Sequence, residues 1–276
     1  LEMKETALNY KIKAKKISKA VNHHFYNPDK NTYIDSRQTH LVLPLIAGVV
    51  PGNDISKVET KLKKEILEVQ DGHFDTGIHG TYFLVKYLTE KNHHDLLFTL
   101  TSQTSYPSYG EIIERGEITW PEYWSECNSR VHGCLNGIGG WFQRGILGIQ
   151  PHPKKVGYKE FIVRPTFHDS LKWAKGHHFS PYGKINVSWK KTDKFYSLEL
   201  TIPDNATATL FIPARAESDI LENNKPISSY EEIQMLGIEN NIAELRVGSG
   251  TYNFKMIPLP NKQPHITTAL NTHLNQ

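Results

Sequence analysis

A carboxylate-rich segment offers the first candidate chemistry in this sequence. Five glutamates lie between residues 102 and 130, a stretch without regular periodicity: Glu111, Glu114, Glu117, Glu122 and Glu126. Glu122 stands out because Trp120 and Trp124 flank it. Indole rings tune the basicity of a neighbouring carboxylate by partial desolvation, and their planes can stack on sugar rings. Cleavage of a glycosidic bond usually needs two carboxyl groups. Glu122 is therefore a candidate catalytic residue, and the alternative is a surface glutamate in an aromatic loop.

A second polar segment, residues 74–81, has the pattern of a turn that leads into a helix. Such turns present side chains and free N–H groups at the mouth of a helical barrel. Asp75 and His79 are therefore candidate substrate-binding residues. Capping of the following helix is the alternative role for Asp75 or Thr76, whereas His79 lies within the first turn and is harder to explain as a cap.

His132 is the third candidate, ten residues after Glu122. The intervening loop could bring it back beside that carboxylate, although a single histidine at a helix start is more often a structural hydrogen-bonding residue. The paired histidines at 23–24, 93–94 and 177–178 lack the spacing of metal ligands. Cys127 and Cys134 form neither a zinc pattern nor a disulfide framework. The sequence predicts no metal site and no cofactor.

Charge and hydropathy argue against two classes of partner. The chain has 276 residues and a formal net charge of +3, which is too small to indicate nucleic-acid binding. The basic run from Lys11 to Lys19 alternates with apolar residues and is best interpreted as a solvated helix face. No run of about 18 apolar residues is present, so no membrane-spanning segment is predicted.

The first half of the chain has helical periodicity. Ile17, Val21 and Phe25 recur at a spacing of four residues, which predicts a helix that ends near Pro28. Further helices are expected over residues 39–50, 55–69, 78–90 and 93–101. A glycine-rich helix is expected over residues 133–149, where the glycines would allow close helix packing.

The pattern changes to a period of two after Pro151-His152-Pro153. Seven strands are predicted, over residues 161–164, 171–179, 184–189, 195–202, 207–212, 242–247 and 251–257. That many short strands in about 100 residues indicate an antiparallel sandwich. Because helices and strands occur in separate blocks, we expect two domains, residues 1–152 and 153–260, followed by a tail over residues 261–276.

The serial order of several motifs resembles one known family. The motifs are Thr76-Gly77-Ile78-His79-Gly80-Thr81, Tyr106-Pro107-Ser108-Tyr109-Gly110, Ile118-Thr119-Trp120-Pro121-Glu122-Tyr123-Trp124, Asn128-Ser129-Arg130-Val131-His132, Gly139-Gly140-Trp141-Phe142 and Gly157-Tyr158-Lys159-Glu160-Phe161. Over about residues 5–257, the chain looks like the C-terminal half of the bacterial α-L-rhamnosidases, glycoside hydrolase family 78. The order of the motifs is more specific than any one of them.

This resemblance implies a fold and an activity. The fold would be part of an (α/α)6 six-hairpin toroid followed by an antiparallel β-sandwich. The activity would be inverting hydrolysis of terminal α-L-rhamnosyl residues from an oligosaccharide or polysaccharide. Glu122 matches the general base, His132 matches a histidine near the sugar subsite, and Trp120 and Trp124 match aromatic positions around the base. Nothing in residues 1–70 resembles the family's general acid, so we expect the acid on an upstream segment, within an N-terminal half of the barrel.

Departures from the family pattern leave other functions open. Pro121 separates Trp120 from Glu122, and His79 stands where the family carries an apolar residue. An extra histidine could meet a sulfate or a uronate on the substrate. One alternative is a polysaccharide lyase or a phosphorylase on a related toroid, and a lyase would use Tyr106 or His132 to abstract a proton. Another is a carbohydrate-binding fragment without turnover.

Overall fold

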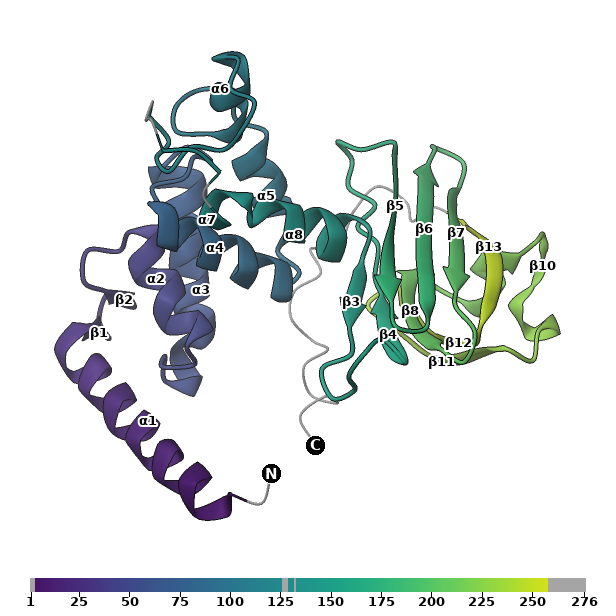
Figure 1. Ribbon diagram of the computed structural model, residues 1–276, viewed down its shortest axis with the longest axis horizontal. Helices are drawn as coiled ribbons and strands as arrows, with labels where there is room; N and C mark the ends of the chain where they lie inside the picture. The colour runs from purple at the N-terminus through teal and green to yellow at the C-terminus, as the bar shows by residue number, and fades with distance from the viewer. Residues whose placement is uncertain (1–2, 126–128, 132, 258–276) are drawn as a thin grey trace. The chain divides into compact units, whose positions relative to one another are not determined.

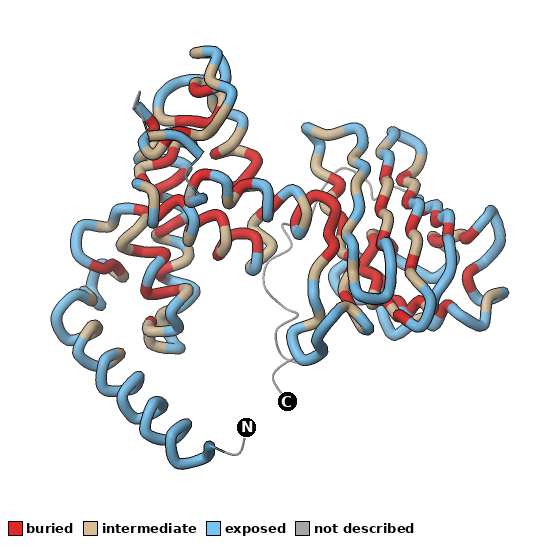
Figure 2. Tube along the Cα trace, viewed as in Figure 1, coloured by how far each residue is buried: buried red, intermediate tan, exposed pale blue. Residues whose placement is uncertain are grey.

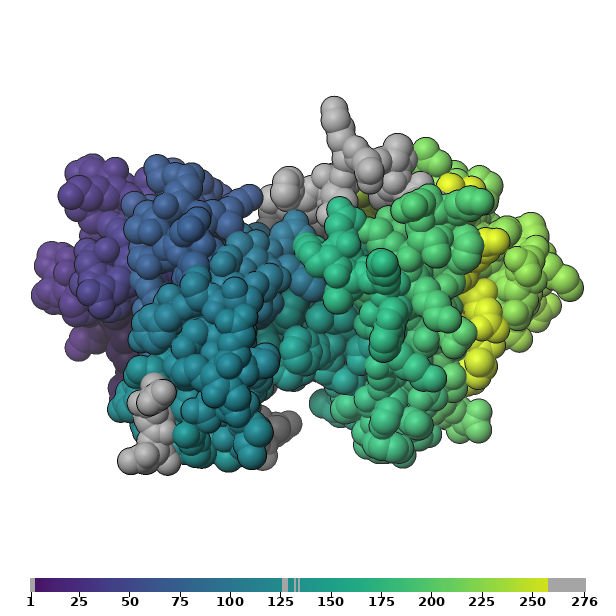
Figure 3. Space-filling model, turned by 90° about the horizontal axis from the view of Figure 1, so that it is seen from above, coloured from purple at the N-terminus to yellow at the C-terminus, as the bar shows by residue number. Residues whose placement is uncertain are grey.

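The computed structural model describes residues 3–125, 129–131 and 133–257. The chain consists of two compact units, a helical unit over Leu1–Ile138 and a strand unit over Gly139–Gln276. In the space-filling view the helical unit runs from purple to teal and the strand unit from green to yellow (Figure 3). The predicted domain boundary after residue 152 lies further along the chain than this division and stays a prediction, and the predicted tail over residues 261–276 lies outside the described residues.

The helical unit contains helices, one small β-ladder and a long connection between α6 and α7 (Figure 1). Its elements are α1 (Lys4–Phe25), β1 (Tyr26–Asn27), β2 (Thr32–Tyr33), α2 (Gln38–Ile46), the 3-10 turn η1 (Gly52–Asp54), α3 (Ile55–Lys64), the π-helical η2 (Glu65–Val69), α4 (Ile78–Glu90), α5 (His94–Thr101), α6 (Tyr109–Glu114) and α7 (Gly133–Asn136). The helices predicted over residues 78–90 and 93–101 are therefore confirmed to within a residue at each end.

Helices α2 and α4 pack closely and form the centre of the helical core. Leu41 and Val42 of α2 and Leu84 and Leu88 of α4 are fully buried. Gly80 permits the close approach, because a Cβ atom built on it would lie 2.0 Å from Oγ1 of Thr39. A larger residue there would force the two helices apart.

Helix α1 differs from the other long helices because it buries nothing. None of its 22 residues is buried, and Figure 2 shows it in pale blue along most of its length. Leu8, Ile12 and Ile17 are all exposed. Its hydrogen bonds with the rest of the unit include those of Asn22, whose side chain donates to the carbonyl of Val49 at 2.9 Å and accepts from the hydroxyl of Tyr33 at 2.5 Å.

The segment after α7 is a broken helix, and the prediction of one continuous helix over residues 133–149 was wrong. Short α8 (Ile138–Trp141) follows α7 and continues into the π-helical η3 (Phe142–Ile146). The proposed role of the glycines was also wrong for Gly139 and Gly140, which are exposed and would have open space around an added Cβ atom.

The strand unit consists of two sheets. Its strands are β3 (Ile149–Pro151), β4 (Glu160–Val163), β5 (Trp173–Ser180), β6 (Gly183–Lys191), β7 (Tyr196–Ile202), β8 (Thr207–Pro213), β9 (Ile220–Glu222), β10 (Lys225–Pro226), β11 (Ile233–Glu239), β12 (Ile242–Val247) and β13 (Gly250–Met256), with 3-10 turns η4 (Glu217–Asp219) and η5 (Ile227–Ser229). One sheet has the order β10-β9-β13-β7-β6-β5 and the other β11-β12-β8-β4-β3. Every pair in these sheets is antiparallel except β4 with β8, which is parallel.

Alternation of side chains builds the core of the strand unit. Ile185, Val187 and Trp189 of β6 are fully buried, whereas the residues between them face outward and are at least partly exposed. The indole N–H of Trp189 donates to the carbonyl of Ile146 at 3.0 Å, which satisfies its one polar group in the core. All seven predicted strands are found, and β3, β9, β10 and β11 were missed.

Candidate functional site

A short hairpin carries Glu122. The backbone N–H of Val131 donates to the carbonyl of Trp120 at 2.9 Å, and that of Glu122 donates to the carbonyl of Ser129 at 3.1 Å. An antiparallel bridge pairs Pro121 with Arg130 between these two bonds. The ladder fixes the backbone of Glu122, whose side chain is partly exposed.

Trp124 ties this hairpin to the turn before α4. Its side chain is only 7% exposed, and its indole N–H donates to the carbonyl of Thr76 at 2.7 Å. The same indole stacks on Phe74, with ring centroids 5.0 Å apart and an interplanar angle of 23°. The two segments that the sequence singled out separately, residues 74–81 and 119–124, are therefore in direct contact.

Tyr109 completes the aromatic cluster and was missed by sequence reasoning. It meets Trp120 edge-on at 5.0 Å and Trp124 edge-on at 5.2 Å. Its hydroxyl donates to the carbonyl of Leu135 at 2.8 Å, so the cluster also reaches α7. Burial raises the pKa of the Tyr109 phenol well above its usual value, so this side chain is a neutral packing residue. Its place in the motif 106–110 was the one signal that could have identified it from the sequence.

Glu111 and Glu117 of this segment bind arginines. Arg115 pairs with Glu111 at 2.9 Å and donates through both terminal nitrogens to the carbonyl of Trp124 at 3.1 Å. Arg130 pairs with Glu117, and this contact is the main reason why the pKa of Glu117 is lowered. These two carboxylates hold the hairpin in place. Glu114 is exposed on α6, and Glu126 lies outside the described residues.

Asp75 caps a helix, although a different one from the helix considered above. Its two carboxylate oxygens accept from the backbone N–H of Gln38, the first residue of α2, at 3.1 and 3.3 Å. The side chain of Gln38 returns to the same turn and donates to the carbonyl of His73 at 2.7 Å. Gly77 is the N-cap residue of α4 and no side chain caps it, so capping of α4 by Asp75 or Thr76 was wrong.

Burial makes the carboxyl group of Asp75 a weaker acid than usual. Desolvation raises its pKa from 3.8 to about 6, against the opposing effect of the Gln38 N–H donor. Glu65, which is buried nearby, also disfavours the charged form. The carboxyl group of Asp75 therefore titrates in mildly acidic solution, where most carboxyl groups are already ionised.

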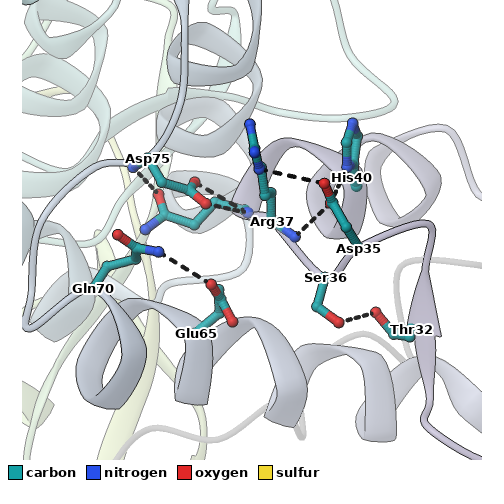
Figure 4. Close-up of polar contacts among 9 residues, drawn as sticks. Thr32, Asp35, Ser36, Arg37, His40, Glu65, Gln70 and Asp75 are labelled. Carbon is teal, nitrogen blue, oxygen red and sulfur yellow. Dashed lines mark hydrogen bonds and ion pairs between the residues drawn. The ribbon is translucent and has the colours of Figure 1, made fainter.

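An exposed cluster of charged residues lies beside Asp75 at the start of α2. Asp35 pairs with Arg37 at 3.3 Å and with His40 at 2.5 Å (Figure 4). The hydrogen bond from His40 is the largest cause of the lowered pKa of Asp35. Sequence reasoning did not identify this cluster, because its three residues carry no recognisable spacing.

The remaining predicted site residues are placed as follows. Trp120 is partly exposed, and His79 is exposed on the first turn of α4. His132 lies outside the described residues. Within the described parts of the chain, no group of three or more histidine, cysteine or acidic side chains could hold a metal ion. In the same parts, no helix has the length and hydropathy needed to cross a membrane.

Two family models match the chain one after the other. The bacterial α-L-rhamnosidase 6 hairpin glycosidase domain matches residues 1–146, which is more than half of the 276 residues. The bacterial α-L-rhamnosidase C-terminal domain matches residues 148–226. The chain belongs to the bacterial α-L-rhamnosidase family. The resemblance seen in the motifs is confirmed, and so is the fold, a partial six-hairpin glycosidase domain followed by a β-sandwich.

Curated relatives are much longer than this chain. An α-L-rhamnosidase of Alteromonas sp. (strain LOR) is 29% identical over 271 residues, which cover 93% of this chain and 28% of that protein. An α-L-rhamnosidase of Formosa agariphila is 30% identical over 222 residues, which cover 78% of this chain and 23% of that protein. The chain thus spans about a quarter of the length of these two rhamnosidases.

Solved rhamnosidase structures share the fold. The α-L-rhamnosidase from Dictyoglumus thermophilum superposes with a TM-score of 0.79 and 29% identity, covering 91% of this chain and 28% of that one. The Streptomyces avermitilis α-L-rhamnosidase complexed with L-rhamnose also gives a TM-score of 0.79, at 24% identity, covering 91% and 24%.

Proposed function

We propose that this chain forms part of an enzyme that hydrolyses terminal α-L-rhamnosyl residues by an inverting mechanism. Membership of the rhamnosidase family and the names of the relatives support the reaction class. The observation that carries the assignment of the site is the contact of Trp124 with Thr76 and Phe74. It joins the Glu122 hairpin and the polar turn before α4 into one aromatic-anchored unit.

In this proposal Glu122 is the general base. An inverting glycosidase uses one carboxylate to activate a water molecule and a second carboxyl group to protonate the leaving oxygen, about 6.5–9.5 Å away. The Glu122 side chain is partly exposed, as contact with water and sugar requires, while its backbone is held by the ladder to Ser129. A fixed backbone reduces the conformational freedom that the base must lose when it aligns a water molecule.

The two tryptophans receive different roles. Trp120 is partly exposed and can offer its ring to a sugar, with Tyr109 supporting it from the side. Trp124 is buried and its N–H is already bonded to Thr76, so we assign it as a positioning residue that places Glu122.

Asp75, His79 and His132 are proposed to contact the substrate. Asp75 accepts one backbone N–H, and a carboxyl group has further lone pairs for a sugar hydroxyl. The exposed imidazole of His79 suits an anionic substituent such as a sulfate or a uronate on the neighbouring sugar. His132 is assigned by its match to the family motif.

An upstream half of the barrel is the proposed partner of the helical unit. The 22 residues of α1 include exposed leucine and isoleucine side chains and no buried residue, so this helix presents apolar surface that further helical hairpins can cover. The general acid is expected on those hairpins. The substrate is proposed to be a rhamnose-containing oligosaccharide or polysaccharide, with no cofactor, nucleic acid or membrane as a partner.

Release of nitrophenol from an aryl α-L-rhamnoside tests the role of Glu122. Nitrophenol leaves readily, so this substrate depends less on a general acid than a natural linkage does. We expect Glu122→Gln to lower kcat by about 100-fold or more, a barrier increase of about 2.7 kcal/mol. Glu114→Gln, an exposed glutamate of the same segment, is the matched control and should keep wild-type turnover.

The anomer of the first-formed rhamnose tests the stereochemistry. Proton NMR during early turnover should show the β-anomer before mutarotation if the mechanism inverts. Equal turnover of wild type and Glu122→Gln would remove Glu122 from the mechanism, and an initial α-anomer would contradict inversion. Rhamnose binding that is lost in Trp120→Ala, without turnover in any variant, would instead favour the sugar-binding alternative.

A further inference from the structure

The outer face of β5 and β6 is an exposed surface of the strand unit that the proposed hydrolysis does not use. Strand β5 lies at the edge of the six-stranded sheet, next to β6. Its inward positions face the core, since a Cβ atom on Gly176 would lie 2.4 Å from Cδ1 of Leu147. The outward positions of β5 are all exposed: Trp173, Lys175, His177 and Phe179.

Two large aromatic rings stand on this face. Trp173 is 63% exposed and Phe179 is 71% exposed. They are six positions apart on one strand, which corresponds to about 20 Å. Neither ring belongs to the core of the strand unit, so both are accessible to a ligand. An edge-on contact with His177, with centroids 4.9 Å apart, holds the ring of Phe179.

Each of these rings has a lysine directly opposite it in the ladder. Trp173 pairs with Lys190, and Phe179 pairs with Lys184, whose ammonium lies 5.7 Å from the centre of the phenyl ring. Directly opposite residues of an antiparallel pair have Cβ atoms about 5 Å apart. The face therefore has a lysine directly across the ladder from an aromatic residue at both ends of β5.

The face has a marked excess of positive charge. Lys175, Lys184 and Lys190 form no ion pair with any residue in the described parts of the chain. The outward positions of β5 and β6 include no acidic residue, and the first one, Glu199, is on β7. Between the two aromatic–lysine pairs, Asn186 and Ser188 offer hydrogen-bonding groups.

We propose that this face binds an acidic polysaccharide whose negative charges are uronate carboxylates. Each aromatic ring would stack on the C–H face of a sugar, and the opposite lysine would meet the carboxylate, which is attached to the sugar ring itself and so lies beside it. Sugar hydroxyls would bond to Asn186 and Ser188. An open strand surface of this length fits a chain of several sugars rather than one monosaccharide.

A second copy of this chain is a poor occupant of the same face. A two-fold symmetric contact would place the face against itself and bring the lysines of both copies together, which costs free energy. An acidic chain instead neutralises them. The site is distinct from the Glu122 hairpin and does not depend on the role proposed for that residue.

Affinity electrophoresis of the whole chain through gels containing polygalacturonate tests the proposal. We expect retardation that weakens with added salt, and none in gels with neutral dextran. The double variants Trp173→Ala/Phe179→Ala and Lys184→Gln/Lys190→Gln should each weaken binding at least 10-fold. Tyr10→Ala, which removes an exposed ring of α1, and Lys11→Gln/Lys16→Gln, which removes two exposed lysines of the same helix, are matched controls and should bind as wild type does.

Several outcomes would overturn the proposal. No retardation by polygalacturonate, unchanged binding in both double variants, or an equal loss in the α1 lysine control would each do so. Tighter binding to dextran sulfate than to polygalacturonate would overturn the assignment of uronate. Sedimentation that shows a dimer of wild type but not of Trp173→Ala/Phe179→Ala would assign the face to a second copy.

Glu122→Gln should bind as wild type does, so failure of the proposed hydrolysis and failure of this site can be told apart. Trp173→Tyr/Phe179→Tyr should restore binding, and circular dichroism checks that each variant is folded.

Discussion

Strand β6 and helix α1 show how differently the two units of this chain use their apolar residues. On β6, Ile185, Val187 and Trp189 are fully buried against the rest of the strand unit. On α1, none of the 22 residues is buried, and Leu8, Ile12 and Ile17 are exposed. The strand unit thus completes its own core, whereas the helical unit leaves one long helix with uncovered apolar side chains. The unit that carries the candidate chemistry is the one with the uncovered helix.

The largest effect is expected from breaking the core of the strand unit. Trp189→Ala removes a fully buried indole and its bond to Ile146, and should lower the free energy of unfolding by about 3–5 kcal/mol. Trp173→Ala, on the neighbouring strand but exposed, should change it by less than about 0.5 kcal/mol. Calorimetry compares the two variants, and similar losses in both would mean that the core is not where the structure places it.

A smaller effect is expected where the helical unit does pack closely. Gly80→Ala should cost about 1–3 kcal/mol, because the new Cβ atom would collide with Thr39 at the contact of α2 with α4. Gly139→Ala has open space around the added atom and should be neutral or stabilising by about 0.4–1 kcal/mol. Urea unfolding measures both variants. A Gly80→Ala protein as stable as wild type would show that α2 and α4 can move apart at little cost.

The titration of Asp75 should make the stability of the helical unit depend on pH. Because its folded pKa is raised from 3.8 to about 6, the folded protein keeps a proton between these pH values that the unfolded chain has released. The free energy of unfolding therefore falls as the pH rises through this window. Asp75→Asn has no charge to desolvate, so its melting temperature relative to wild type should be higher at pH 7.5 than at pH 4.5, by about 2–4 °C. A melting-temperature difference between Asp75→Asn and wild type that does not change with pH would contradict the raised pKa. Asp71→Asn, which removes a carboxylate at an exposed position, is the control.

The smallest effect is expected on α1. Ile17→Ser replaces an exposed side chain and should change the stability of this chain by less than about 0.5 kcal/mol. Leu84→Ala, at a fully buried position of α4, should cost about 2–5 kcal/mol by comparison. Thermal unfolding of both variants measures the contrast between a covered and an uncovered helix. A large loss in Ile17→Ser would show that α1 already has an apolar partner within this chain.

Periodicity was sufficient to predict most of the elements. The four-residue spacing of Ile17, Val21 and Phe25 marked α1, and the alternation in residues 184–189 marked β6, because these patterns follow directly from the geometry of helix and strand. Patterns failed where elements are very short, as in β9 and β10, and where glycines interrupt a helix, as between α7 and α8. Two or three residues hold too few repeats for a period to be recognised.

Within the site, the sequence by itself determined which residue types are present and in what order, and this order was enough to indicate the rhamnosidase family. Only the tertiary structure decided their contacts. The bond from Trp124 to Thr76 spans 48 residues, and the cap that Asp75 forms on α2 spans 37. Contacts of such separation leave no local pattern, because they depend on where the intervening helices bring the chain back. The same limit explains why Asp75 appeared to belong with the helix that follows it, when its carboxylate in fact stabilises one that precedes it.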